Sequence, residues 1–244
     1  MGMVEFFADS LLSGFSGSSA MGKGIVLVQI CTSIMMFTFI FGKWRELIEQ
    51  RRASRRVARD VMGGRTVIDH YLQRRENGHT VLENIYWSSI ERLLKLFSPN
   101  VRNQLLSRQP NAATALTTHE MGLVKSLCEH VLDEESIRVE KGMGMIATVV
   151  AIAPMLGLLG TVWGVLDAFA EMGAAGSATI ATMAPAISSA LVTTVVGLLI
   201  AIPGVCLHNW LSATMRDLLA DMEGFADDLM GRIALEFQEQ GRGA

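Results

Sequence analysis

Three long apolar runs without charge constrain this sequence more than any other feature. They span about residues 24–42, 142–166 and 182–207, and none contains Asp, Glu, Lys or Arg. A helix needs roughly 20 apolar residues to cross a bilayer. Because 50% of the 244 residues are hydrophobic and only 18% are charged, the chain is too apolar for an ordinary soluble domain. We therefore predict an all-α membrane protein with three transmembrane helices that extend into a cytoplasmic helical bundle.

Basic residues predict the orientation of these helices. Lys and Arg are dense just after the first run, whereas only Lys23 lies just before it and residues 167–181 contain none. Basic loops stay on the cytoplasmic side. We therefore expect residues 1–23 in the periplasm, where they can form an interfacial helix, and a short periplasmic loop at 167–181. Residues 43–141 and 208–244 are expected in the cytoplasm, which makes the chain a multi-pass protein of the bacterial inner membrane.

The polar segments have helical patterns. Breaks are expected at Gly63–Gly64, Asn77–Gly78, Ser98–Asn100 and Pro110. Apolar residues at spacings of three and four predict amphipathic helices. Their predicted buried faces comprise Val81, Ile85, Ile90, Leu93, Leu94 and Phe97; Leu116, Leu123, Leu127 and Val131; and Leu218, Met222, Phe225, Leu229, Ile233 and Phe237. The last set belongs to a cytoplasmic C-terminal helix that continues the third span without a break.

Small residues form one face of the second span. Gly157, Gly160, Thr161 and Gly164 are separated by three and four positions, which places them on the same side of a helix. Small residues let helix backbones approach closely in lipid. We predict helix packing by the glycines. Packing alone and a functional role are both open for this face.

The third span combines hydroxyl and small residues. It contains Ser188, Ser189, Thr193 and Thr194, together with the small pairs Ala186–Ala190 and Gly197–Ala201. We predict helix packing through Ala186, Ala190 and Gly197. Hydroxyls within membrane helices often bond to a backbone carbonyl one turn earlier, so a structural role is the alternative to a polar path.

Three prolines are candidate helix kinks: Pro154, Pro185 and Pro203. Each removes a backbone donor, so the carbonyl four residues earlier lacks its usual partner. In a bilayer that carbonyl needs a hydroxyl, water or another helix. Such a kink either lines a wet path or shapes the packing.

No span supplies an acid or base for proton transfer. A proton carrier within a membrane normally needs an ionisable group, so a partner would have to bring it. The sequence has no P-loop, nucleophile elbow or HExxH pattern, and its three cysteines have no zinc-binding spacing. We therefore expect no enzymatic activity, no catalytic residue, no cofactor, no metal site and no nucleic-acid partner.

Two segments resemble the TolQ/ExbB/MotA proton-channel family. Residues 153–164, APMLGLLGTVWG, are similar to the second-span signature of TolQ and ExbB, and residues 184–194, APAISSALVTT, are similar to the third-span signature. Residues 197–203 and Asn209 continue the similarity. The predicted topology also fits this family.

The resemblance implies a subunit of a motor driven by the proton motive force. Family members form a pentamer around two transmembrane helices of a single-span TolR/ExbD-type partner, whose membrane aspartate titrates. Proton flow would rotate one ring relative to the other and transmit force to the envelope, a transport system or a motility system. By match to the motifs, Thr161 and Thr194 would face the partner, and the predicted ion pathway comprises Thr161, Ser189, Thr193 and Thr194.

Ser189 is a departure from the pattern, because a glutamate commonly stands there in TolQ and ExbB. The titrating role of that glutamate is therefore not carried over to Ser189, which stays in the predicted pathway as a hydroxyl residue. Sodium coupling is an alternative to proton coupling. A protein of a different class, a non-conducting membrane scaffold or signalling protein packed through glycine faces, is the alternative function.

Overall fold

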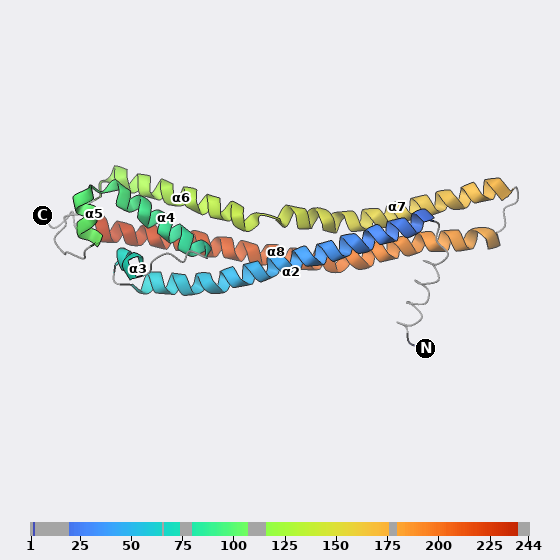
Figure 1. The fold of residues 1–244 in the computed structure, drawn as a ribbon, viewed down its shortest axis with the longest axis horizontal. Helices are drawn as coiled ribbons and strands as arrows, with labels where there is room; N and C mark the ends of the chain where they lie inside the picture. The colour runs from blue at the N-terminus through green and yellow to red at the C-terminus, as the bar shows by residue number, and fades with distance from the viewer. Residues whose placement is uncertain are drawn as a thin grey trace. The chain divides into compact units, whose positions relative to one another are not determined.

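The computed structural model describes residue 2 and residues 20–64, 66–73, 80–106, 116–175 and 180–238. Within these ranges the regular elements are all helices, which confirms the predicted all-α class. They are α2 (Ala20–Gly63), α3 (Val67–Gln73), α4 (Val81–Leu96), α5 (Pro99–Leu106), α6 (Thr118–Glu140), α7 (Met143–Ala175) and α8 (Ile180–Gln238) (Figure 1). Most of the predicted N-terminal segment, residues 1–23, lies outside the described residues.

Three helical stretches are long and apolar enough to cross a membrane. They lie in α2, in the stretch Thr118–Gly173 that contains most of α7, and in α8. This agrees with the three predicted spans and makes the chain a multi-pass membrane protein. The chain divides into two compact units. The first comprises Met1–Lys43 and Gly142–Ser212 and contains the apolar parts of these helices, and we call it the membrane unit. Trp44–Lys141 and Ala213–Ala244 form a second unit, which we call the polar unit. Helices α2 and α8 contribute residues to both.

The helix that contains the predicted second span is longer than that span. Helix α7 continues to Ala175 rather than ending near Leu166, and α8 begins at Ile180. Most of the loop predicted at 167–181 is therefore helical. Asp167 and Glu171 end the apolar run but not the helix, because glutamate tolerates a helical backbone well and aspartate tolerates it adequately. At the other end, Gly142 has a φ of 91°, a left-handed conformation that glycine adopts readily, and it separates α6 from α7.

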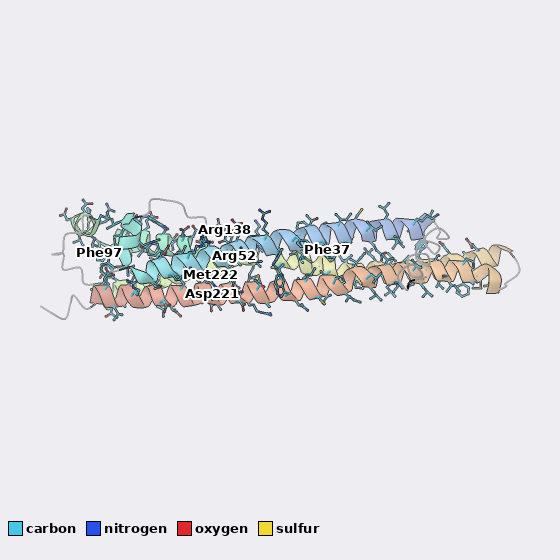
Figure 2. All side chains as sticks on the ribbon, turned by 90° about the horizontal axis from the view of Figure 1, so that it is seen from below. Phe37, Arg52, Phe97, Arg138, Asp221 and Met222 are labelled. Carbon is cyan, nitrogen blue, oxygen red and sulfur yellow. The ribbon has the colours of Figure 1, made fainter. Side chains whose placement is uncertain are left out.

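The polar unit has an apolar core beneath a charged surface. The residues predicted as the buried face of the C-terminal helix are all buried: Leu218, Met222, Phe225, Leu229, Ile233 and Phe237. Met222 is fully buried whereas its neighbour Asp221 is exposed (Figure 2). Helix α4 packs along α6 (Figure 1).

The predicted buried face of residues 116–131 was partly wrong. Leu116 and Val131 are buried, but Leu123 is 42% exposed. The buried face of α6 instead contains Val124 and Cys128, one position further round the helix. Burial raises the pKa of the Cys128 thiol, so it stays neutral and acts as a small hydrophobe in this core.

Hydrogen bonds from side chains close the helix ends of the polar unit. Arg232 donates to the carbonyl oxygens of Val61 and Gly64 at 2.6 and 2.7 Å, which caps the end of α2. Glu236 accepts the backbone N–H of Val67 at 2.7 Å, at the start of α3. Helix ends leave such backbone groups without intrahelical partners, so these two residues of α8 tie the short connection between α2 and α3 to the unit.

Candidate functional site

Helices α7 and α8 meet along a zipper of small residues in the membrane unit. A Cβ atom added to Gly164 would lie 2.5 Å from Ala190 Cβ, and one added to Gly160 would lie 2.6 Å from Thr193 Cβ. On Gly157 it would lie 3.0 Å from Thr194 Cα. The chain positions pair in opposite directions, as expected for antiparallel helices. Three of the predicted packing glycines therefore provide backbone contact between α7 and α8.

Two threonine hydroxyls of α8 converge on one carbonyl of α7. Thr194 Oγ1 donates to Gly157 O at 2.8 Å, and Thr193 Oγ1 lies 3.3 Å from the same oxygen. Thr193 also donates to Ala190 O at 2.7 Å within its own helix. Thr193 is 1% exposed, whereas Thr194 is half-buried. The close approach at Gly157 makes this interhelical contact possible.

The other two predicted pathway residues bond locally. Thr161 Oγ1 donates to Leu158 O at 2.8 Å, and the residue is half-buried at the edge of the zipper. Ser189 Oγ donates to Ala186 O at 2.9 Å and is 7% exposed. Their oxygen lone pairs can still accept a hydrogen bond from a neighbouring group. The structure thus brings Thr193 and Thr194 to α7, whereas Thr161 and Ser189 bond within their own helices.

Gln29 is a polar residue of this region that the sequence analysis did not single out. It lies on α2, is 0% exposed, and donates from Nε2 to Thr193 O at 3.0 Å. Gly197 faces it: an added Cβ would lie 3.0 Å from Gln29 Nε2 and 2.9 Å from Ala153 O. Helices α2, α7 and α8 therefore meet here. The sequence feature that could have identified Gln29 is a polar amide within an otherwise apolar run.

The three prolines lie within continuous helix. Pro154 is inside α7, and Pro185 and Pro203 are inside α8. Neither helix is interrupted at a proline, and the bend at each proline stays a prediction. The hydroxyls of the zipper bond to Gly157, Leu158, Ala186 and Ala190, and none of these is the carbonyl four residues before a proline.

The outer face of α7 is strongly apolar. Met155, Leu158 and Leu166 are 67%, 62% and 58% exposed, while the glycines face α8. Across the described parts of the three spans, the buried polar groups are uncharged. The α7–α8 pair therefore presents hydroxyl groups and an apolar surface.

Comparison with known proteins found a matching family model. Residues 98–224, more than half of the chain, match the model of the MotA/TolQ/ExbB proton channel family. The matched residues include α6, all of α7 and the membrane part of α8.

Individual relatives support the same family. The Tol-Pal system protein TolQ of Haemophilus influenzae is 28% identical over 90% of this chain and 91% of its own length. The biopolymer transport protein ExbB of Xanthomonas campestris pv. campestris (strain B100) is 44% identical over 39% of this chain, which is 38% of that protein. TolQ of Pseudomonas aeruginosa is 38% identical over 40% of this chain and 42% of its own length.

Proposed function

We propose, from the premise that this chain belongs to the MotA/TolQ/ExbB proton channel family, that it forms the channel wall of a motor driven by the proton motive force. The observation that carries the proposal is the α7–α8 pair, in which hydroxyl groups lie at a glycine zipper between spans that contain no acid. A wall of this kind can solvate a proton carrier but cannot replace it.

The titrating group would be an aspartate on a partner. We infer a single-span TolR/ExbD-type protein, two copies of which would lie within a ring of five copies of this chain. The exposed apolar face of α7 supports contact with other membrane helices or lipid, since the described residues of the chain do not cover it. Force would then pass to the cell envelope or to a transport or motility system. No enzymatic step is needed for this work.

The chain would lie in the bacterial inner membrane with its N-terminus outside and its C-terminus in the cytoplasm. Arg45, Arg52, Arg55 and Arg56 support this orientation, because they follow the first span and are exposed. Basic residues at this position keep the adjoining segment on the cytoplasmic side.

Hydroxyl removal tests the ion-path role of Thr161 and Thr194. The full chain, tagged and purified from native membranes with whatever copurifies, would be reconstituted into vesicles, and proton entry would be driven by a potassium diffusion potential. The double variant Thr161→Val, Thr194→Val should assemble normally, because valine has nearly the same size, but should lose most of its proton flux. Flux equal to that of the unmodified complex would refute the proposal.

A matched control separates the path from general loss of hydroxyls. Thr38 and Thr148 are exposed and donate to carbonyls of their own helices, Ile34 O at 2.7 Å and Gly144 O at 2.9 Å. The double variant Thr38→Val, Thr148→Val should therefore keep its flux. Equal losses in the two double variants would also count against a specific path.

The alternative function is a non-conducting scaffold or signalling protein. One observation favours it: the glycine face of α7 is occupied by α8 of the same chain, so packing alone explains the glycines. The copurification step distinguishes the two functions. A small single-span protein with an aspartate in its span, present at fewer copies than this chain, would support the motor, whereas its absence together with zero proton flux would support the scaffold.

A further inference from the structure

We propose that Gln29 is a positioning residue, which holds the Thr193–Thr194 segment of α8 against α7 and thereby fixes the Thr194 hydroxyl in the channel wall. This inference rests on the proposed function, because it assigns a role to Thr194 in proton flux. It adds a residue of the first span to a site otherwise built from α7 and α8.

The contact is directional and closely packed. Gln29 Nε2 donates to Thr193 O at 3.0 Å and the side chain is fully buried. Gly197, one turn further along α8, leaves the space for the amide, since an added Cβ would lie 3.0 Å from Nε2. The same Cβ would lie 2.9 Å from Ala153 O of α7. One glycine therefore allows α2 and α7 to reach α8 at the same level.

A gain in stability does not explain why the Gln29 amide is buried at this position. Gln29 Oε1 is buried and has no hydrogen-bond partner within the described structure. Burying an unpaired polar atom costs at least as much free energy as a typical hydrogen bond contributes. Thr193 O lies within α8, where the N–H four residues later is its regular partner. An apolar side chain of similar length would avoid the unpaired oxygen, so the effect of Gln29 is directional rather than a gain in stability.

Gln29 on α2 and Gly157 on α7 hold the same segment of α8 from two sides. Thr194 donates its hydroxyl to Gly157 O on α7, and Thr193 Oγ1 lies 3.3 Å from the same oxygen, while Gln29 holds the Thr193 carbonyl from α2. Rotation of α8 about its axis would break these bonds together. Gln29 therefore limits the rotation that would move Thr194 away from Gly157.

Replacement of the amide tests this role. Gln29→Met keeps the length and apolar stem of the side chain but cannot donate to Thr193 O. We expect the purified complex to retain its subunit composition and its melting temperature, while proton flux falls about 3- to 10-fold, the range that loss of one hydrogen bond can produce. Gly197→Ala should lower flux at least as much, because its methyl group would meet both the amide of Gln29 and the backbone of α7 at Ala153 O. Full flux in Gln29→Met would overturn the proposal.

A double-mutant cycle distinguishes positioning from a general packing defect. If Gln29 acts through Thr194, Gln29→Met should lower flux in the unmodified chain but have no further effect in the Thr194→Val background. Multiplicative losses would show that the two residues act independently and would overturn the positioning role.

The proteins of the cycle, together with the Thr161→Val, Thr194→Val variant, also separate this inference from the proposed function. Loss of flux in Thr194→Val with normal flux in Gln29→Met would overturn only the role of Gln29. Normal flux in both the Thr194→Val and the Thr161→Val, Thr194→Val variants would refute the ion path itself.

Discussion

The two units of this chain differ in the side chains that they expose and in the residues that bring their helices together. In the polar unit, large apolar residues such as Leu229 are fully buried and acids such as Asp221 face outward. In the membrane unit, many large apolar residues such as Met155 face outward, and glycines, Thr193 and Gln29 lie inside together with buried apolar side chains. Water drives burial of apolar surface in the first unit, but lipid provides no such force between membrane helices, which associate by close packing and hydrogen bonds.

The difference predicts where a change of one side chain matters most. In the polar unit the largest losses should follow removal of volume from the core. In the membrane unit they should follow addition of volume at the zipper. The predictions that follow are ordered by the size of the effect on the free energy of unfolding.

Removal of a core side chain in the polar unit should have the largest effect. Leu229 is 0% exposed, so Leu229→Ala loses buried apolar surface and leaves a cavity. We expect a loss of about 2–5 kcal/mol, measured by denaturant unfolding of the full chain in detergent. Leu235→Ala is the matched control on the same helix, because Leu235 is 64% exposed, and its loss should stay within about 0.5 kcal/mol. Equal losses would mean that the outer face of α8 is covered in the assembly.

Addition of one methyl group at the zipper should have the next largest effect. On Gly160, a Cβ would lie 2.1 Å from Thr193 Oγ1 and 2.6 Å from Thr193 Cβ. We therefore expect Gly160→Ala to destabilise the membrane unit by about 1–3 kcal/mol, although alanine is the better helix former. Thermal unfolding in detergent is the measurement.

Gly144→Ala is the control for this substitution. It lies on the same helix, and nothing would lie within 4 Å of its added Cβ. It should leave the melting temperature unchanged or raise it, because alanine has the higher helix propensity. A lower melting temperature for Gly144→Ala than for Gly160→Ala would contradict the zipper.

The limits of sequence-based prediction also differ between the units. The spans, the fold class and the buried face of the C-terminal helix depend on hydropathy and on local spacing, so they could be predicted. The end of α7 could not be placed from hydropathy, because Asp167 ends the apolar run without ending the helix. The predicted buried face of α6 differs from the observed one by about one position, since Leu123 is exposed and Cys128 is buried.

The candidate site was predictable only where its residues lie in local motifs. The spacing of Gly157, Gly160 and Gly164 already showed a packing face. Nothing local showed that Gln29 contacts Thr193, because the two residues are 164 positions apart and an amide within an apolar run does not indicate which helix it contacts. Contacts of this kind depend on which helices become neighbours, which is a tertiary property.

Removal of the N-cap of α6 should have a smaller effect. Thr117 Oγ1 accepts the Glu120 backbone N–H at 3.2 Å, and Glu120 accepts the Thr117 N–H at 2.8 Å. Thr117→Ala should lower stability by about 1 kcal/mol, measured by denaturant unfolding at neutral pH. Thr118→Ala, at the adjacent exposed position, should have less effect, and the reverse order would contradict the cap.

The pH dependence of this cap has a defined sign. Hydrogen bonds from the backbone and side chain of Thr117 lower the pKa of Glu120 from its ordinary value of 4.5. The stabilisation from its carboxylate is therefore present above 4.5 and is lost as the pH falls through the lower folded value. The stability difference between Thr117→Ala and the unmodified chain should shrink over that range, and a difference that grows there would contradict this assignment.

The smallest effect is expected for a surface ion pair of the polar unit. Arg51 and Asp217 lie 3.0 Å apart, with 31% and 58% of their side chains exposed. Exposed pairs contribute about 0–1 kcal/mol and are screened by salt, so Asp217→Asn should lower the free energy of unfolding by less than about 0.5 kcal/mol. Asp227→Asn, at another exposed acid of α8, is the control. A loss from Asp217→Asn as large as that from Leu229→Ala, persisting in high salt, would show that charge rather than the apolar core stabilises this unit, and the contrast between the two units would fail.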